Sequence, residues 1–302
     1  MTQLKLAINV PAMNLSAYLR LARPLDWLKN GFVPLGLLFA EAWHHAPLVI
    51  DVALVTVAFC LAASAVYAFN DVSDADADRK HPRKRQRPVA SGAISVRQAL
   101  VFSISLAFLA LAIAAWVRAE ALGLVGAYLV LNLFYSRLLR RIPFVDVLTI
   151  AAGFMLRVLA GTVGVGIPPS GWLLATALAL TLFLGFAKRR AEFVAANGEP
   201  ARASLAAYNQ RLLNGLTVAT ALAAGALYVG FTFDARSIQW HAAPNLWMTA
   251  PPALAVLARY TWLAFRNGKG ENPARELIGD AWIAIFALLW LAITMAVIGG
   301  FT

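Results

Sequence analysis

The chain has 302 residues, of which 61% are hydrophobic and only 14% are charged, and its mean hydropathy is +0.69. This composition excludes a soluble domain of the same length and indicates a polytopic membrane protein. The net charge is +11 and no nucleic-acid-binding motif accompanies it, so the basic residues favour anionic lipid head groups and phosphorylated substrates over nucleic acid.

Apolar runs of about 20 residues predict a single all-α domain, residues 1–302, with nine membrane-spanning helices. The first predicted span is short and contains Glu41. No cleavable signal is expected, because the first 20 residues lack an apolar core followed by a small-residue cleavage site. The nine predicted spans are 31–46, 49–69, 97–117, 120–137, 146–166, 171–187, 214–233, 245–265 and 279–299.

The Lys and Arg residues are concentrated on one side of the predicted membrane. All except Arg118, Arg157 and Arg236 fall within or next to the N-terminal segment 1–30 and the loops on its side. The positive-inside rule therefore predicts a cytoplasmic N-terminus and an external C-terminus. We expect a cytoplasmic active site, formed by the long hydrophilic segments on that side, which are residues 70–97, 188–211 and 266–280.

An acidic cluster follows the second predicted span. Asp71, Asp74 and Asp78 are spaced by three and four residues, so on a helix they lie within roughly 60° of one another, whereas Asp76 points away. Like charges on one face repel unless a cation lies among them. Mg²⁺ prefers such oxygen ligands and often joins one or two carboxylates to a substrate phosphate. We predict that the three acids bind Mg²⁺, with Mn²⁺ as a substitute; the alternative is a solvated acidic helix end.

A basic loop, residues 80–92, comes directly after the acidic cluster. Its prolines prevent it from continuing as a helix. A metal-binding acidic face followed by basic residues is suited to a polyphosphate, because the metal and the Lys and Arg side chains can share the phosphoryl oxygens. Taken alone, the loop is better explained by membrane topology and attraction to lipid.

A second cationic segment, residues 188–211, begins Lys188-Arg189-Arg190 and contains no Asp; its acids are Glu192 and Glu199. A second metal site is therefore not expected. A cationic pocket for a monophosphate, on a sugar or a lipid, is the interpretation that we favour. The alternative is a basic helix end with a Lys188–Glu192 pair, whose long side chains extend toward the interface.

Arg157 is predicted to lie inside the membrane. It follows Asp146 by eleven residues, roughly 16 Å deeper along the same helix. A charge at that depth must face the bundle interior or a wet cavity. Contact with a substrate phosphate and a structural hydrogen-bonding role both remain open for Arg157. Tyr135, at the end of a predicted span, is either an interface anchor or a ligand.

The string Asn70-Asp71-x-x-Asp74-x-x-x-Asp78 resembles the first aspartate-rich motif of the UbiA prenyltransferase superfamily, an intramembrane fold of nine helices. Residues 78–92 and three other stretches, 23–30, 146–161 and 188–192, are similar to the branch of decaprenyl-phosphate phosphoribosyltransferases. Two positions depart from the pattern. Asp26 stands where Gln is expected, and Arg140 stands where Lys is expected, which changes the geometry of a phosphate ligand.

The resemblance implies a bacterial inner-membrane enzyme that transfers 5-phosphoribosyl from 5-phosphoribosyl 1-diphosphate to a polyprenyl phosphate. It implies Mg²⁺ on the three aspartates, contact with membrane lipids, and leaves a homo-oligomer open. The alternatives are an aromatic prenyltransferase and a transporter, the latter disfavoured because the charged motifs lie on one side. Besides the three aspartates, the implied site residues are Asn70, Lys29, Asn30, Lys84, Arg87, Tyr135, Arg140, Asp146, Arg157, Lys188 and Arg189.

Overall fold

The computed structural model describes residues 14–82, 84–196, 203–266 and 279–300, and within these ranges the regular structure is helical, without strands. The α-helices are α1 (Leu15–Ala22), α2 (Leu35–Phe39), α3 (Ala46–Ser73), α4 (Ala75–Lys80), α5 (Val96–Val117), α6 (Ala119–Arg137), α7 (Val145–Ala160), α8 (Gly171–Ala195), α9 (Gln210–Phe233), α10 (Ala235–Trp240), α11 (Ala250–Arg266) and α13 (Ala281–Ile298). Short 3₁₀ helices join them: η1 (Pro24–Phe32), η2 (Ala42–His44), η3 (Lys84–Gln86), η4 (Leu139–Arg141), η5 (Val163–Val165), η6 (Ala203–Ala207) and η7 (Leu246–Thr249).

In the described part of the chain, seven helices are long and apolar enough to cross a membrane, so the protein is a multi-pass membrane protein. The other two of the nine predicted spans are not found as such. Residues 31–46 are divided among η1, α2 and η2, with Pro34 before α2 and Glu41 in a left-handed conformation. The span 245–265 is shortened to α11, which begins at Ala250 because Pro251 and Pro252 fit only the first turn of a helix.

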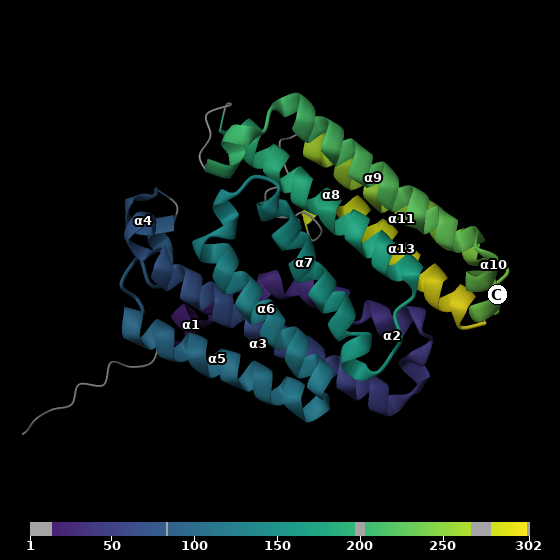
Figure 1. Cartoon of the computed structure of the whole chain (residues 1–302), viewed down its shortest axis with the longest axis horizontal. Helices are drawn as coiled ribbons and strands as arrows, with labels where there is room; N and C mark the ends of the chain where they lie inside the picture. Colours follow the sequence, from purple (N-terminus) through teal and green to yellow (C-terminus); the bar gives the residue numbers. More distant parts are fainter. Residues whose placement is uncertain (1–13, 83, 197–202, 267–278, 301–302) are drawn as a thin grey trace, which may run out of the picture.

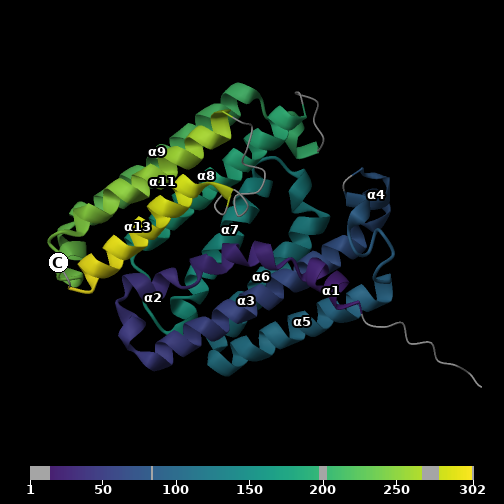
Figure 2. The ribbon, with the colours of Figure 1, turned by 180° about the vertical axis from the view of Figure 1, so that it is seen from behind.

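The helices form two groups with α7 between them (Figure 1). One group contains α1, α3, α5 and α6, and the other contains α8, α9, α11 and α13. Helix α7 packs against α6 on one side and α8 on the other. Seen from behind, η1 and α2 also run between the groups (Figure 2), where η1 contacts both α3 and α7. Residues of η1 and α7 are therefore placed to line any space between the two groups.

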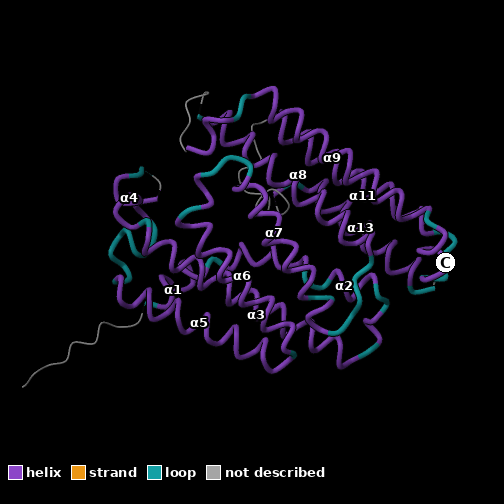
Figure 3. The backbone as a smooth tube through the Cα atoms, in the orientation of Figure 1, coloured by secondary structure: helices purple, strands orange, loops and turns teal. Residues whose placement is uncertain are grey.

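Most of the loops that join the long helices lie toward the two ends of the bundle (Figure 3). Helix α4 lies at one end and α10 at the other. The segment 188–211, expected as a loop, begins instead as the last turns of α8, which continues to Ala195. The segment 70–97 contains α4 and η3. Most of the segment 266–280 lies outside the described residues.

Candidate functional site

A polar cavity of about 310 Å³ lies between the two groups of helices. Its wall is cationic, because Arg23, Lys29, Arg157 and Lys188 all line it and Asp26 is the acid among the lining residues. The sequence predicted three of these four cations as site residues, together with Tyr135. The remaining lining residues are Tyr67, Tyr128, Asn132, Thr149, Ile150, Gly153, Phe154 and Leu184.

Two acids of the predicted cluster are buried and share an arginine. Asp71 is 1% exposed, and its Oδ1 accepts from Arg23 Nη2 at 2.5 Å. Arg87 Nη1 lies 2.7 Å from Asp78 Oδ2 and 3.4 Å from Asp71 Oδ1. Because Arg23 lines the polar cavity, the Asp71 carboxylate is joined to that cavity through a guanidinium group.

The prediction that Asp71, Asp74 and Asp78 share one face assumed that the acidic segment is one regular helix. The structure shows that it is not. Helix α3 ends at Ser73 and α4 begins at Ala75, with Asp74 between them. The Asp74 carboxylate receives two hydrogen bonds from Arg140, at 3.2 and 3.3 Å, instead of meeting the other two acids. Asp76 points away as predicted: its side chain is 93% exposed and pairs with Arg79 at 2.5 Å.

The acidic segment has buried oxygen atoms without partners, and these bear on whether it could bind a metal ion. Among the described residues, no three or more Asp, Glu, His or Cys side chains are close enough to hold one ion, so a preformed site with three carboxylates is not present. However, Asp71 Oδ2 and Asn70 Oδ1 are buried and have no hydrogen-bond partner. Unpaired buried oxygens are costly, and Mg²⁺ needs only one or two carboxylates beside water and phosphate. The residues present therefore fit a divalent ion at Asn70 and Asp71.

Lys29 is a permanent cation of the cavity wall. Its Nζ lies 2.5 Å from Asp26 Oδ1 and 3.5 Å from the Tyr67 hydroxyl. Burial favours the neutral amine, but Tyr67 and Asp26 outweigh it and hold the pKa of Lys29 above its ordinary value. Asp26, the position that departs from the family pattern, is therefore the direct partner of a predicted phosphate ligand.

Arg157 makes hydrogen bonds that use all three of its guanidinium nitrogens. Nε donates to Asn30 Oδ1 at 2.7 Å, Nη1 to the Gly153 carbonyl at 2.7 Å and Nη2 to the Tyr128 hydroxyl at 3.0 Å. Asn30 is fully buried and donates in turn to Cys60 Sγ at 3.1 Å. The structural role left open for Arg157 is therefore present, and contact with a phosphate stays a prediction. Asn30 does not itself line the cavity, but it holds Arg157, which does, through their hydrogen bond.

Asp146 and Arg189 form a buried ionic cluster away from the cavity. Both side chains are 0% exposed, with Arg189 Nη1 3.4 Å from Asp146 Oδ2 and 2.7 Å from Glu192 Oε2. The Tyr208 hydroxyl donates to Asp146 Oδ1 at 3.3 Å, and burial raises the pKa of Tyr208 to about 12, so it remains a donor. Neither Asp146 nor Arg189 lines the polar cavity, so the structure does not bring them together with Lys29 and Arg157, and their contact with substrate stays a prediction. Lys84, also expected there, is exposed on η3.

Sequence reasoning missed several residues of the cavity wall, although helical spacing could have found some of them. Tyr67 precedes Asp71 by four residues on α3, and Asn132 precedes Tyr135 by three on α6. Residues at these spacings share a helix face. Tyr128 precedes Asn132 by four residues and therefore shares the same face of α6, but its contact with Arg157 depends on how α6 packs against α7 and could not be read from spacing.

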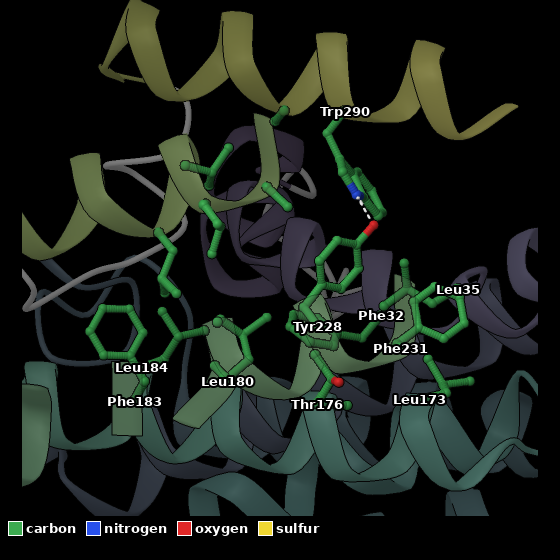
Figure 4. A pocket seen from close by; sticks show the side chains of 18 of the residues that line it. Phe32, Leu35, Leu173, Thr176, Leu180, Phe183, Leu184, Tyr228, Phe231 and Trp290 are labelled. Atoms are coloured by element: carbon green, nitrogen blue, oxygen red, sulfur yellow. Dashed lines mark hydrogen bonds between the residues drawn. The ribbon is translucent and has the colours of Figure 1, made fainter. Parts of the chain in front are cut away.

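A second cavity of about 370 Å³ is apolar and adjoins the polar one. Figure 4 shows its wall, formed mainly by aromatic and aliphatic side chains, with the Tyr228 hydroxyl accepting from Trp290 Nε1 at 2.6 Å. Leu184 lines both cavities, and in η1 Leu28 lines the apolar cavity while its neighbour Lys29 lines the polar one. Lys188 follows Leu184 by one turn of α8. Lys29 and Lys188 therefore lie at the boundary between the two cavities.

Comparison with known proteins places these features in context. The model of the UbiA prenyltransferase family matches residues 31–278. The decaprenyl-phosphate phosphoribosyltransferase of Corynebacterium glutamicum is 33% identical over 296 residues, which cover 95% of this chain and 89% of that protein. The enzyme of the same name from Mycobacterium tuberculosis is 32% identical, over 93% and 94% of the two chains.

Solved structures agree with the fold. A UbiA homologue from Archaeoglobus fulgidus, bound to GPP and Mg²⁺, matches with a TM-score of 0.68 and 20% sequence identity, over 94% of this chain and 99% of that one. At this level of identity the likeness shows a shared fold alone.

Proposed function

Because this chain belongs to the UbiA prenyltransferase family and matches phosphoribosyltransferases along nearly its whole length, we propose that it transfers 5-phosphoribosyl from 5-phosphoribosyl 1-diphosphate to a polyprenyl phosphate, releasing diphosphate. One structural observation supports this proposal most directly. A cationic cavity adjoins an apolar one, with lysines at their boundary. A lipid phosphate needs both environments side by side, because its chain and its head group differ so strongly in polarity.

The polarity of the two cavities supports a placement for each part of the acceptor. The proximal isoprene units would lie in the apolar cavity, and the lipid phosphate would meet Lys29 and Lys188 at the boundary. Both ammonium groups can donate to phosphoryl oxygens without fixed geometry, which suits a monophosphate. The segment from Lys188 to Arg211 contains no Asp, so it offers no second aspartate-rich site of the kind expected for an aromatic prenyltransferase.

The donor would place its diphosphate toward the acidic segment, where Arg23 joins the cavity wall to Asp71. Asn70 and Asp71, with Asp78 beside them, are the residues that would hold Mg²⁺. When bound, the ion would supply Lewis-acid neutralisation of the departing diphosphate. Arg23 and Arg87 can donate to phosphoryl oxygens that the ion leaves uncovered.

The acceptor requires no general base, because a lipid phosphate is already anionic at neutral pH. The protein's task is to hold two anionic substrates close together, and the cations of the wall offset their mutual repulsion. Displacement of diphosphate in one in-line step would invert the configuration at C1 of the ribose. We further propose that the site faces the cytoplasm of a bacterial inner membrane, with the N-terminus inside and the C-terminus outside.

The test uses purified protein in detergent with Mg²⁺. Incubation with 5-phosphoribosyl 1-diphosphate and a polyprenyl phosphate should give the mass of a phosphoribosylated lipid. A parallel reaction with a prenyl diphosphate and an aromatic acceptor should give none. Product in the second reaction alone would favour the aromatic prenyltransferase, and turnover without a membrane gradient would exclude a transporter.

Removal of divalent ions is expected to abolish activity. With EDTA in excess, no phosphoribosylated lipid should form, because the charge of the departing diphosphate is then not neutralised. Addition of Mg²⁺ or Mn²⁺ above the chelator concentration should restore the rate. Full activity in EDTA, measured as diphosphate release, would contradict the metal requirement.

Substitution of Lys188 by Ala should weaken binding of the lipid phosphate. We expect a loss of about 1–3 kcal/mol in apparent affinity, the scale of one hydrogen bond to a charged group. Titration of the lipid phosphate at saturating donor would show this as a raised KM. The control is Arg236→Ala, which removes an exposed cation of α10 at the other end of the bundle and should leave both KM values unchanged. Unchanged KM values in Lys188→Ala would refute the boundary assignment.

A further inference from the structure

Arg23 occupies an unusual position between the acids and the cavity. Its guanidinium contacts Asp71 Oδ1 at 2.5 Å, lies 5.0 Å above the Tyr67 ring and lines the polar cavity. The other oxygen of Asp71, Oδ2, is buried without a hydrogen-bond partner. One side of a candidate metal ligand is thus held by a fixed positive charge, and the other side is available.

The backbone at Arg23 fixes where its side chain begins. The residue has a left-handed conformation, with φ of 53°, at the junction of α1 and η1. Its N–H donates to the Leu19 carbonyl at 3.2 Å, and its own carbonyl accepts from the Asp26 N–H at 2.9 Å. Side-chain rotation is therefore the available way for this guanidinium to move between Asp71 and the cavity.

A guanidinium and a divalent ion compete for one carboxylate, because two cations within a few ångströms repel each other. An arginine cannot relieve this repulsion by losing its proton, since its pKa is too high. Another anion favours its departure from the carboxylate, and a phosphoryl group fits the same planar fork of donors. The cavity that Arg23 lines is the proposed place of such a group.

From this geometry we propose that Arg23 competes with the divalent ion for Asp71 and moves from Asp71 to the diphosphate of the donor when the donor binds. Metal and diphosphate would then bind with positive coupling. Diphosphate would draw Arg23 away from Asp71, which the ion needs, and the ion would release Arg23 to bind the diphosphate. The inference rests on the proposed function. It adds a reason why the divalent ion would replace the Arg23 guanidinium at Asp71 when the donor binds. Arg87 acts in the same direction, because its Nη1 lies 3.4 Å from the same Asp71 oxygen, Oδ1, and 2.7 Å from Asp78 Oδ2.

The experiment measures binding of Mn²⁺ alone to the purified full chain in detergent, by electron paramagnetic resonance, without substrates. Arg23→Gln should bind Mn²⁺ with a dissociation constant about fivefold or more below that of the wild type, the lower end of ordinary coupling energies. Arg23→Lys keeps the charge and should stay near the wild type. Arg23→Asn, whose side chain tolerates the left-handed backbone, provides a second neutral variant if Arg23→Gln does not fold.

Two further variants make the outcomes distinguishable. Arg79→Gln is the matched control. This substitution removes the same charge as Arg23→Gln, but Arg79 pairs with the exposed Asp76 on the same segment. It should leave the dissociation constant unchanged. In the double variant Arg23→Gln/Asp71→Asn, the tighter Mn²⁺ binding expected of Arg23→Gln alone should disappear.

Unchanged or weaker Mn²⁺ binding in both neutral variants would overturn the proposal. So would equal gains in Arg23→Lys and Arg23→Gln, which would assign the effect to lost packing. If the wild type binds Mn²⁺ and Asp71→Asn does not, while Arg23→Gln changes nothing, the competition fails and the metal site of the proposed function stands. If neither the wild type nor any Arg23 variant binds Mn²⁺, both fail.

Discussion

Asp71→Asn is expected to lower kcat by at least about a hundredfold, the scale of losing one electrostatic stabiliser in an active site. The substitution keeps the shape of the side chain and removes its charge. It would weaken the binding of the divalent ion and also the contact with Arg23, which donates a hydrogen bond to Asp71 Oδ1 at 2.5 Å. The measurement is the initial rate of phosphoribosyl transfer with both substrates saturating.

Asp76→Asn provides the control within the same segment. Its carboxylate is 93% exposed and contacts only Arg79 among the ion pairs of the described residues, so kcat should change by less than about twofold. Asp78→Asn should resemble Asp71→Asn, because both carboxylates share Arg87. Asp74→Asn is also expected to lose activity. Such a loss would indicate that Asp74 leaves Arg140 and contacts the ion during turnover. Equal losses at all four positions would contradict the distinction drawn here.

The long spans were predictable from sequence because lipid requires about 20 apolar residues in succession, a signal that needs no tertiary information. The predicted span 97–117 matches α5, Val96–Val117, within one residue. The segment 31–46 shows the limit of this reasoning. It is apolar enough to be buried, but Pro34 and the left-handed Glu41 divide it, and its burial comes from packing against α3 and α7.

Some site residues were predictable from the family resemblance and from the charge and depth of single residues. Lys29, Arg157 and Lys188, which the resemblance implied as site residues, do line one cavity. Arg189 was not predictable, because a sequence shows a charge without its partner. Its neighbours Asp146 and Glu192 neutralise it inside the protein, and this depends on α7 packing against α8.

The wall of the polar cavity depends on a close backbone contact between η1–α2 and the end of α7. A Cβ atom built at Gly161 would overlap the backbone carbonyl of Val33, and one built at Gly36 would overlap the carbonyl of Gly161. Backbone atoms cannot turn aside as a flexible side chain can. The contact lies three residues after Asn30, which holds Arg157 in place, so the packing and the cavity wall are coupled.

Gly161→Ala is therefore expected to destabilise the protein by about 3 kcal/mol or more, at the upper end of overpacking effects. The φ of Gly161 is −82°, which Ala adopts freely, so the loss would come from the contact with Val33 and not from backbone strain. Thermal unfolding in detergent should show a lowered midpoint, and Gly36→Ala should behave alike because it disrupts the same contact. The control is Gly123→Ala on α6, where an added Cβ would meet no atom within 4 Å beyond its own stretch of helix, and the change in stability should stay within about 1 kcal/mol. A Gly161→Ala midpoint equal to that of Gly123→Ala would show that η1 and α7 can separate without cost, and the coupling between this contact and the cavity wall would then be wrong.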